Sequence, residues 1–331
     1  MKRWEAPSDA SGERLDRYLA RALDLPRNQI QRLIRDGRAT VDGRSATSAQ
    51  PVEPGRWLAV EIPLPSDDRV APEEGDLAVL YEDPSLIVVD KPAGVAVHPG
   101  AGRTIGTLVH RLLHRYPELA GVGGPGRPGI VHRLDLGTSG VLVVARTPAS
   151  YQRLSADFAR RRVEKRYLAL GYGAPRLPQG KVEAAIGRHP ERRKEMTLRP
   201  DGRPALSRWW CRGSAQGVSL FEVEITTGRT HQIRVHLKSI GHPLVGDPVY
   251  GEARYKSCPR GAQGLLKAFS RPALHAWRLS LVHPESGEPM SFEAPVPADL
   301  SVLWRKLSGR EIGDELTRAG VGLGREEREH R

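Results

Sequence analysis

Residues 127–147 read RPGIVHRLDLGTSGVLVVART. The apolar pair Ile130 and Val131 leads into the polar segment HRLD, the loop LGTSG turns the chain, and VLVVA leaves as a run typical of a buried strand. The pattern therefore sets the carboxylate of Asp135 at a junction between a strand and a loop, where binding and catalytic residues are common. Taken alone, an Asp in such a loop more often closes a turn by accepting backbone N–H bonds.

Strand-like runs separated by turn residues lie on both sides of this stretch. Helical segments interrupt them without strict alternation, so we expect an α+β fold with a mixed, largely antiparallel sheet and not a doubly wound parallel one. The expected strands include runs within 77–100, 141–147, 166–172, 220–228 and 278–284, and the expected helices lie near 107–116, 149–161 and 230–240.

The last of these helices carries a second candidate group. Thr230 is a suitable N-cap for HQIRVHLKSI, residues 231–240, whose Ile233 and Leu237 share one face. This spacing puts Arg234 in the first turns of the helix. By itself, an arginine at this position is usually a surface side chain.

The first 62 residues form a separate small pattern. An amphipathic helix starts near Leu15, Asn28 can cap a second helix that ends near Gly37, and strands are expected near Ala39 and in WLAVEI, 57–62. Four arginines surround the second helix and its following turn, either as a solvated face or as contacts to a polyanion. They are Arg27, Arg32, Arg35 and Arg38.

This arrangement of two helices, the turn RDGRATVDGR and a closing strand resembles the S4 RNA-binding domain over residues 13–62. The resemblance implies that the second helix and its loop contact RNA. We expect four segments in the chain: an S4-like domain at 1–62, a proline-rich and acidic linker at 63–76, a catalytic domain at 77–307, and a mobile charged tail at 308–331.

The stretch HRLD followed by TSG resembles the signature of the RluA family of RNA pseudouridine synthases. Three further segments match that family in the expected order, so the resemblance covers about residues 77–297. The family commonly has Lys-Asp between HRLD and TSG, whereas this chain has Leu136 and Gly137. The further segments are KRYLAL, TGRTHQIRVHLKSIGHPLVGDPVYG and LHAWRLSLVHP.

The resemblance implies a role for several residues. Asp135 falls on the catalytic nucleophile, and Arg234 falls on the basic residue that pairs with it. Tyr167 falls on the active-site tyrosine, which packs against the target uracil or transfers a proton. Ile233 and Val235 flank Arg234 as candidates for the apolar floor of the base pocket. The implied reaction isomerises uridine to pseudouridine within RNA and needs no cofactor.

The charge of the chain favours the same partner. The formal net charge is +12 and the isoelectric point is about 10.0, values typical of proteins that bind polyanions such as nucleic acid. Between Arg153 and Arg212 there are 16 Lys and Arg against 6 Asp and Glu, which we interpret as a track for the RNA backbone. The candidate contacts are Arg160, Arg161, Arg162, Arg192 and Arg193, with His132 and Arg133 beside the nucleophile.

Other classes of protein fit less well. No apolar run reaches the roughly 18 residues of a membrane span, and no signal-peptide segment opens the chain, so we expect a cytoplasmic protein. Cys211 and Cys258 lack zinc spacing, and we expect both to be reduced packing residues. The histidines show no HExxH arrangement, and no dinucleotide or Walker-type loop is present, so neither a metal nor a small-molecule cofactor is expected.

The RNA substrate is the open point. An S4-like domain before the catalytic domain resembles the family members that modify large-subunit ribosomal RNA, so we expect this RNA, free or in an assembling subunit. A transfer RNA synthase is the alternative within the class. A non-catalytic RNA-binding or ribosome-assembly factor is the alternative outside it. A metal-dependent RNA hydrolase would require clustered carboxylates with His or Cys ligands, and Asp135 has no carboxylate neighbour in its loop.

Overall fold

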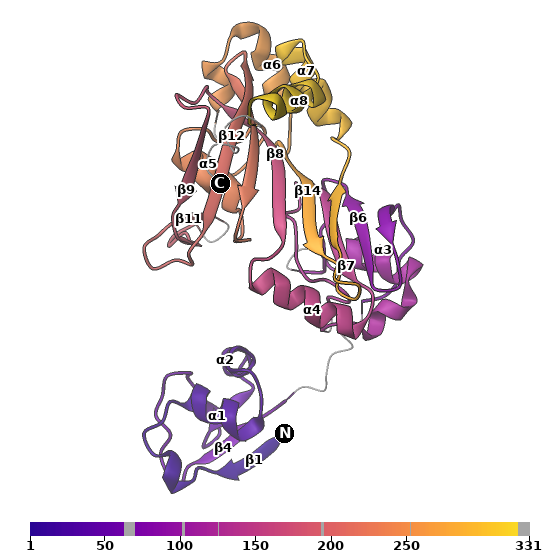
Figure 1. Ribbon diagram of the computed structural model, residues 1–331. Coiled ribbons are helices and arrows are strands. Elements are labelled where there is room, and N and C mark those ends of the chain that lie inside the picture. The colour runs from indigo at the N-terminus through magenta and orange to yellow at the C-terminus, as the bar shows by residue number, and fades with distance from the viewer. Residues whose placement is uncertain (63–69, 101–102, 125, 193–194, 252, 324–331) are drawn as a thin grey trace, which may run out of the picture. The chain divides into compact units, whose positions relative to one another are not determined.

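A computed structural model describes residues 1–62, 70–100, 103–124, 126–192, 195–251 and 253–323 of the chain. The chain divides into two compact units, residues 1–68 and 69–331. The division lies inside the linker that the sequence predicts at 63–76. Each unit has its own hydrophobic core. The helices and strands are labelled in Figure 1.

The first unit packs two helices on a small antiparallel sheet with the strand order β1-β4-β2-β3. Leu15, Leu19, Ile30 and Leu58 are among its buried core residues, which agrees with the apolar helix faces read from the sequence. The first strand was not predicted. The elements are β1 (Lys2–Glu5), η1 (Ser8–Ala10), α1 (Leu15–Leu23), α2 (Arg27–Arg35), β2 (Ala39–Val41), β3 (Arg44–Ser45) and β4 (Trp57–Val60).

A buried carboxylate joins the two helices of this unit. Asp16 in α1 has no exposed side-chain surface and accepts hydrogen bonds from Arg14, Arg27 and Gln31. The bond from Arg14 is the main reason that the pKa of Asp16 lies well below its usual range, although burial opposes this shift. Because α2 begins at Arg27 after Pro26, Asn28 lies within the helix, and the prediction that it caps the helix is wrong.

The second unit is built on a nine-stranded sheet, in which eight strands follow the order β5-β6-β7-β14-β8-β13-β12-β9 and the ninth, β15, pairs with β14. Every pair in it is antiparallel except β7 with β14, which confirms the expected α+β class. The strands are β5 (Ala78–Glu82), β6 (Leu86–Lys91), β7 (Ser139–Ala145), β8 (Glu164–Tyr172), β9 (Gln179–Glu183), β12 (Leu206–Ala215), β13 (Val218–Ile225), β14 (Leu274–Val282) and β15 (Pro289–Glu293), with a separate hairpin of β10 (Ile186–Arg188) and β11 (Met196–Leu198).

Helices cover this sheet and its ends. The predicted helices near 107–116, 149–161 and 230–240 are all present, and α6, α7 and α8 gather at one end of the sheet (Figure 1). The helices are α3 (Leu108–Arg115), η2 (Pro117–Gly121), α4 (Pro148–Ala159), α5 (Gln232–Ser239), η3 (Arg254–Ser257), α6 (Arg260–Ala268), α7 (Ala298–Ser308) and α8 (Ile312–Leu323).

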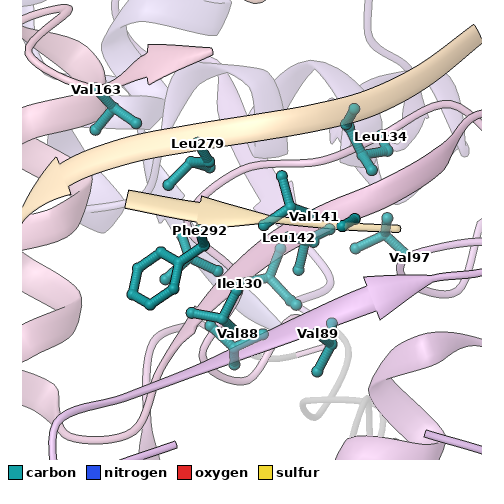
Figure 2. Close-up of a cluster of buried hydrophobic side chains, with 14 of the residues drawn as sticks. Val88, Val89, Val97, Ile130, Leu134, Val141, Leu142, Val163, Leu279 and Phe292 are labelled. Atoms are coloured by element: carbon teal, nitrogen blue, oxygen red, sulfur yellow. The ribbon is translucent and has the colours of Figure 1, made fainter. Parts of the chain in front are cut away.

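The main core surrounds β6 and β7. Val88, Val89, Val141 and Leu142 are at most 1% exposed, because these adjacent strands are apolar on both faces (Figure 2). Phe292 of β15 joins the same cluster. The strand that leaves the HRLD segment is therefore fixed along its whole length by packing, and it gives the loop before it a rigid base.

Both expected boundary segments are partly structured. Val70 packs against the main core, and the carboxylate of Glu73 accepts the backbone N–H of Gly106, so residues 70–76 belong to the second unit and not to a linker. At the other end, α8 begins with the buried Ile312, and Glu315 is only 4% exposed. The prediction of a mobile tail from 308 is therefore wrong as far as these residues, because their apolar side chains complete a packed cluster.

A glycine allows the single parallel pairing of the sheet. Gly140 pairs with Ala276 of β14 and has φ +116°, a backbone conformation that side chains rarely adopt. A Cβ atom built on Gly140 would lie 2.1 Å from the carbonyl oxygen of Ala276. The close approach of the two strands therefore requires glycine, and it fixes the end of the LGTSG loop.

Replacing Gly140 by Ala is expected to push β7 away from β14 and to displace the loop that carries Asp135. We expect a loss of about 3 kcal/mol or more in the free energy of unfolding. Urea unfolding of the full chain measures it. Gly121→Ala is the matched control, because a Cβ there meets nothing within 4 Å, and equal stability of the two variants would contradict this account of the strand pairing.

Candidate active site

The three residues for which the sequence predicts catalytic roles lie on the wall of one cavity. Asp135, Tyr167 and Arg234 line it together with Ile233 and Leu274, and its volume is about 80 Å³. They come from the loop before β7, from β8 and from α5, which lie 32 or more residues apart in sequence. The sheet order brings them together, because β14 pairs with both β7 and β8.

The loop that carries Asp135 is held by backbone contacts on both sides. The backbone N–H of Gly94 donates to the carbonyl of Leu136, and the Arg271 guanidinium donates to the carbonyl of Gly137. Within the loop, the Thr138 N–H donates to the Asp135 carbonyl. The two residues at which the loop departs from the family pattern thus make backbone contacts, and the position of the carboxylate does not depend on their side chains.

Arg234 is buried and held by two carboxylates. Its Nε and Nη2 donate to the two oxygens of Asp247 at 2.6 and 2.8 Å, and its Nη1 lies 3.4 Å from Oδ2 of Asp135. Burial lowers the pKa of the guanidinium, but the hydrogen bonds and charge of Asp247, together with Asp135, raise it on balance. A permanent positive charge therefore faces Asp135 from a fixed direction.

Sequence reasoning missed Asp247. Its side chain is fully buried and also accepts the backbone N–H groups of Val249 and Tyr250. The residue lies 13 positions after Arg234 in the segment GHPLVGDPVYG, which has no periodic pattern. An acidic residue in a Gly- and Pro-rich loop was the available signal, and only the fold connects it with Arg234.

Tyr167 forms an apolar wall of the cavity. It is 7% exposed, and its hydroxyl has no hydrogen-bond partner among the residues that the structure describes. Burial, with a smaller contribution from the charge of Asp135, raises its pKa well above the usual range. The side chain is therefore a neutral phenol at physiological pH, able to donate a proton in a hydrogen bond but not to act as a phenolate base.

His231 is a further group beside Asp135. Its Nε2 lies 4.0 Å from Oδ2 of Asp135, and its Nδ1 is 2.8 Å from the Tyr250 hydroxyl, which accepts the backbone N–H of Met196. The contact with Tyr250 holds the ring so that its Nε2 faces Asp135. Burial lowers the pKa of His231, although the charge of Asp135 opposes this shift.

Two expectations for α5 need correction. The helix begins at Gln232 after His231, a residue with φ +57°, so Thr230 is not its N-cap. Ile233 lines the cavity, whereas Val235 packs in a separate cluster with Ile186 and Tyr250. Residues two apart on a helix are separated by about 200°, so Val235 points away from the cavity and does not form part of its floor.

Lys91 orders the segment that contacts the loop of Asp135. Its side chain is fully buried, and its Nζ donates to the carbonyls of Pro92 and Val95, which orders the segment that contacts the Asp135 loop through Gly94. Burial lowers the pKa of Lys91 to about 7, and the charge of Asp135 opposes this shift. The pattern DKPAG gave no reason to expect this role.

Comparisons with known proteins agree with this geometry. A family model described as RNA pseudouridylate synthase matches residues 85–239, and an S4 domain model matches residues 13–58. The chain is 48% identical to an uncharacterized RNA pseudouridine synthase of Chloroflexus aurantiacus, with 92% of this chain and 93% of that protein covered. It is 43% identical to the ribosomal large subunit pseudouridine synthase D of Xanthomonas campestris, with 91% of each chain covered.

The chain belongs to the RNA pseudouridine synthase family. Among solved structures, the human RNA pseudouridylate synthase domain containing 1 is similar with a TM-score of 0.56 and 29% identity, over 75% of this chain and 96% of that one. Both expected resemblances are thus confirmed, and the protein is an RNA pseudouridine synthase with an S4 domain, an isomerase that acts on RNA.

In this synthase the four arginines expected to contact RNA from the S4 domain are not equivalent. Arg27 is engaged with the buried Asp16, and Arg38 pairs with Glu61 at 3.0 Å. Arg32 and Arg35 are exposed and have no acidic partner within 4.0 Å among the described residues. The last two are therefore the better placed for an external anion.

The candidates in the synthase domain also differ. Arg160 and Arg161 are exposed, whereas Arg162 lies 3.6 Å from Asp157, and Arg192 lies 3.3 Å from Glu195. Arg193 lies outside the described residues. Arg133 is exposed and lines the same cavity as Asp135. His132 stacks on Phe158 and accepts the backbone N–H of Val143, and burial lowers its pKa to about 3, so it is neutral.

Two features bear on the other sequence expectations. Cys211 and Cys258 are both free thiols. Within the described ranges no group of three or more His, Cys, Asp and Glu is arranged to hold a metal ion.

Replacing Asp247 by Asn should leave the Arg234 guanidinium buried without its main counter-charge. We expect a loss of about 3 kcal/mol in the free energy of unfolding and a fall of at least tenfold in kcat, because the guanidinium loses its fixed direction toward Asp135. Denaturant unfolding and pseudouridine assays measure the two effects.

Asp201→Asn is the control for this variant. Asp201 pairs with Arg199 on the surface, with 68% of its side chain exposed, so its loss should change stability by about 1 kcal/mol or less. Wild-type activity in Asp247→Asn would show that Asp247 does not position Arg234.

Proposed function

We propose that this synthase converts specific uridines of large-subunit ribosomal RNA to pseudouridine, with Asp135 as the nucleophile. The observation that carries the proposal is the buried Arg234, which Asp247 holds with one nitrogen directed at Asp135, on the wall of a cavity that Tyr167 also lines. The choice of RNA is supported by the S4 domain and by relatives named for the ribosomal large subunit in Xanthomonas, Zymomonas and Nitrosomonas.

The reaction rearranges atoms without net oxidation. The N1–C1′ bond of uridine breaks, the uracil turns, a C5–C1′ bond forms, C5 loses its proton and N1 gains one. Product and substrate are isomers, so the balance requires no cofactor or external energy. What the protein must supply is a nucleophile or base, a place for the free uracil to turn, and exclusion of water from the intermediate.

Asp135 supplies the first of these. Attack on C1′, attack on uracil C6 and elimination from the sugar each begin with an ionised carboxylate. Arg234 directs a positive charge at this carboxylate, since its Nη1 lies 3.4 Å from Oδ2. About a fifth of the Asp135 side chain is exposed, so the carboxylate faces the cavity and can meet a substrate.

Tyr167 acts in this proposal as a wall for the uracil. Its ring is held in the sheet between β13 and β14, and its raised pKa keeps the hydroxyl protonated. A flat apolar face suits stacking on a pyrimidine. Together with Ile233, it would keep the detached base close to the sugar while it turns.

The base must leave the RNA stack before it can reach the cavity. Unstacking and unpairing cost about a few kcal/mol, which contacts to the RNA backbone must offset. Arg133 is exposed at the cavity, and Arg32 and Arg35 on the S4 domain are free of acidic partners among the described residues. These side chains are the first candidates for such contacts.

The proposed substrate also suggests where the protein acts. Since large subunits assemble in the cytoplasm, we place the protein there. No helix of the described chain is long and apolar enough to cross a bilayer.

The first test is a map of pseudouridine in total cellular RNA. Cells with the gene, cells without it, and null cells carrying Asp135→Asn are compared at single-nucleotide resolution. We expect specific large-subunit ribosomal sites to disappear in the null and in the Asp135→Asn cells, because the amide cannot act as the nucleophile, while RNA binding by the purified variant is retained.

The other outcomes are equally informative. Sites lost only from transfer RNA would keep the mechanism and reject the proposed substrate. An unchanged map in the null cells would favour a binding or assembly factor, and restoration of the sites by Asp135→Asn would reject Asp135 as nucleophile.

A comparison of Tyr167→Phe with Tyr167→Leu separates the two roles of the tyrosine. If catalysis depends on the ring, Phe should keep at least about fivefold more activity than Leu, since stacking on the base is worth about 1–3 kcal/mol. Single-turnover rates on the mapped RNA measure this difference. Equal losses in both variants would indicate that the hydroxyl, through proton transfer, is the essential group.

A further inference from the structure

A second cleft adjoins the catalytic cavity. Its volume is about 500 Å³, and it lies between the end of α4, the strand β8 and the loop that follows β13. Tyr167, Ile225 and Arg133 line both spaces, so the two are neighbours that share a wall. A molecule with a base in the first space can therefore extend into the second.

The cleft is lined by cationic side chains, with no acidic one among the described residues. Its lining includes five cationic side chains, and no Asp or Glu is found among its lining residues in the described chain. The pKa of Arg229 is lowered, first by burial and then by the charges of Arg203 and Arg161. The five cationic residues are Arg133, Arg161, Lys165, Arg203 and Arg229.

Lys165 is a buried cation in this cleft without an acidic partner among the described residues. It is only 8% exposed, yet it forms no hydrogen bond or ion pair within the described residues, and its Nζ lies 5.8 Å from the centre of the Phe158 ring. Burial lowers its pKa to about 8. A buried ammonium without a counter-charge costs stability, so its presence here indicates a ligand that supplies the missing charge.

The position of Lys165 follows from the strand. Residues two apart on β8 point to the same face, so Lys165 lies on the same side of the sheet as Tyr167. Arg166, between them, points to the other side and pairs with Glu222 and Glu164. Lys165 therefore faces the cleft, and Tyr167, two residues later, lines both the cleft and the catalytic cavity.

Most other cations of the basic stretch are neutralised within the protein. Acidic partners lie within 4.0 Å of the guanidinium groups of Arg162, Arg199, Arg208 and Arg212. The excess of positive charge in this part of the sequence is thus not spread evenly over the surface. Three of its unpaired members, Arg161, Lys165 and Arg203, meet in the cleft.

We propose that this cleft binds a backbone phosphate of the RNA strand next to the uridine held in the catalytic cavity, with Lys165 as its innermost contact. The inference rests on the proposed function, because it takes the strand to be that of the substrate RNA. A phosphate suits the site because it is an anion with several acceptor oxygens, and one is present on each side of every nucleotide. The contact holds the flipped nucleotide against the shared wall of Tyr167.

The test compares variants in an Asp135→Asn background, where the reaction is blocked. Binding to a transcript of unmodified large-subunit ribosomal RNA is measured over a range of KCl concentrations. Lys165→Met should raise Kd by about tenfold and reduce the slope of log K against log salt by about one, as expected for one lost phosphate contact. Arg203→Gln, a change at an exposed residue, should act in the same direction.

Lys267→Met is the matched control. Lys267 is an exposed lysine on α6 that lines neither space, and its replacement removes the same charge. It should leave Kd and the slope unchanged. Lys165→Met should also melt no lower than the wild type, because it removes an unpaired buried charge and keeps the length of the side chain. Unchanged Kd and slope in Lys165→Met, or equal losses in the Lys267→Met control, would refute the phosphate site.

Turnover separates this inference from the proposed function. With Asp135 intact, Lys165→Met should raise KM by about tenfold and change kcat little, because a backbone contact is made equally in ground and transition states. A wild type that forms no pseudouridine in the transcript would reject the proposed substrate. The binding assay on the blocked enzyme would still decide whether Lys165 and Arg203 contact a phosphate.

Discussion

The guanidinium of Arg234 is shared between two carboxylates of different burial. Asp247 is fully buried and takes two of its nitrogens, and Asp135 is partly open to the cavity and faces the third. The two hydrogen bonds to Asp247 fix the orientation of the buried guanidinium, so its Nη1 is held facing Asp135. The α5 N-terminus, the Asp247 loop and the loop before β7 must all be in position for this contact.

The parallel pairing of β7 with β14 helps to bring these elements together. Gly140 lets β7 approach β14 closely, β14 also pairs with β8, and thus Asp135 and Tyr167 lie on neighbouring elements. The same register places Lys165 two residues before Tyr167 on the same face. The cavity that Asp135 lines and the neighbouring cleft therefore share strand β8 and the wall formed by Tyr167. A change in the position of β8 affects both.

The sequence predicted the structure best in segments where a local hydrophobic pattern and a family motif occur together. It predicted the α+β class, the helices near α3, α4 and α5, and the three residues that line the cavity. It did not find Asp247 or Lys165, and it paired Val235 with Ile233 although helical geometry separates them. It also proposed Arg27 and Arg38 as RNA contacts and could not show that Asp16 and Glu61 pair with them.

The sequence by itself determined the apolar periods, the turns, the net charge and the order of the motifs, because each of these depends on residues close together in the chain. Only the tertiary structure decided which charges are neutralised and which remain open. Asp247 lies 13 residues from Arg234, and Asp135 lies 99 residues from it. Coulomb energies and hydrogen bonds depend on distance in space and on burial, and strand register and packing set both.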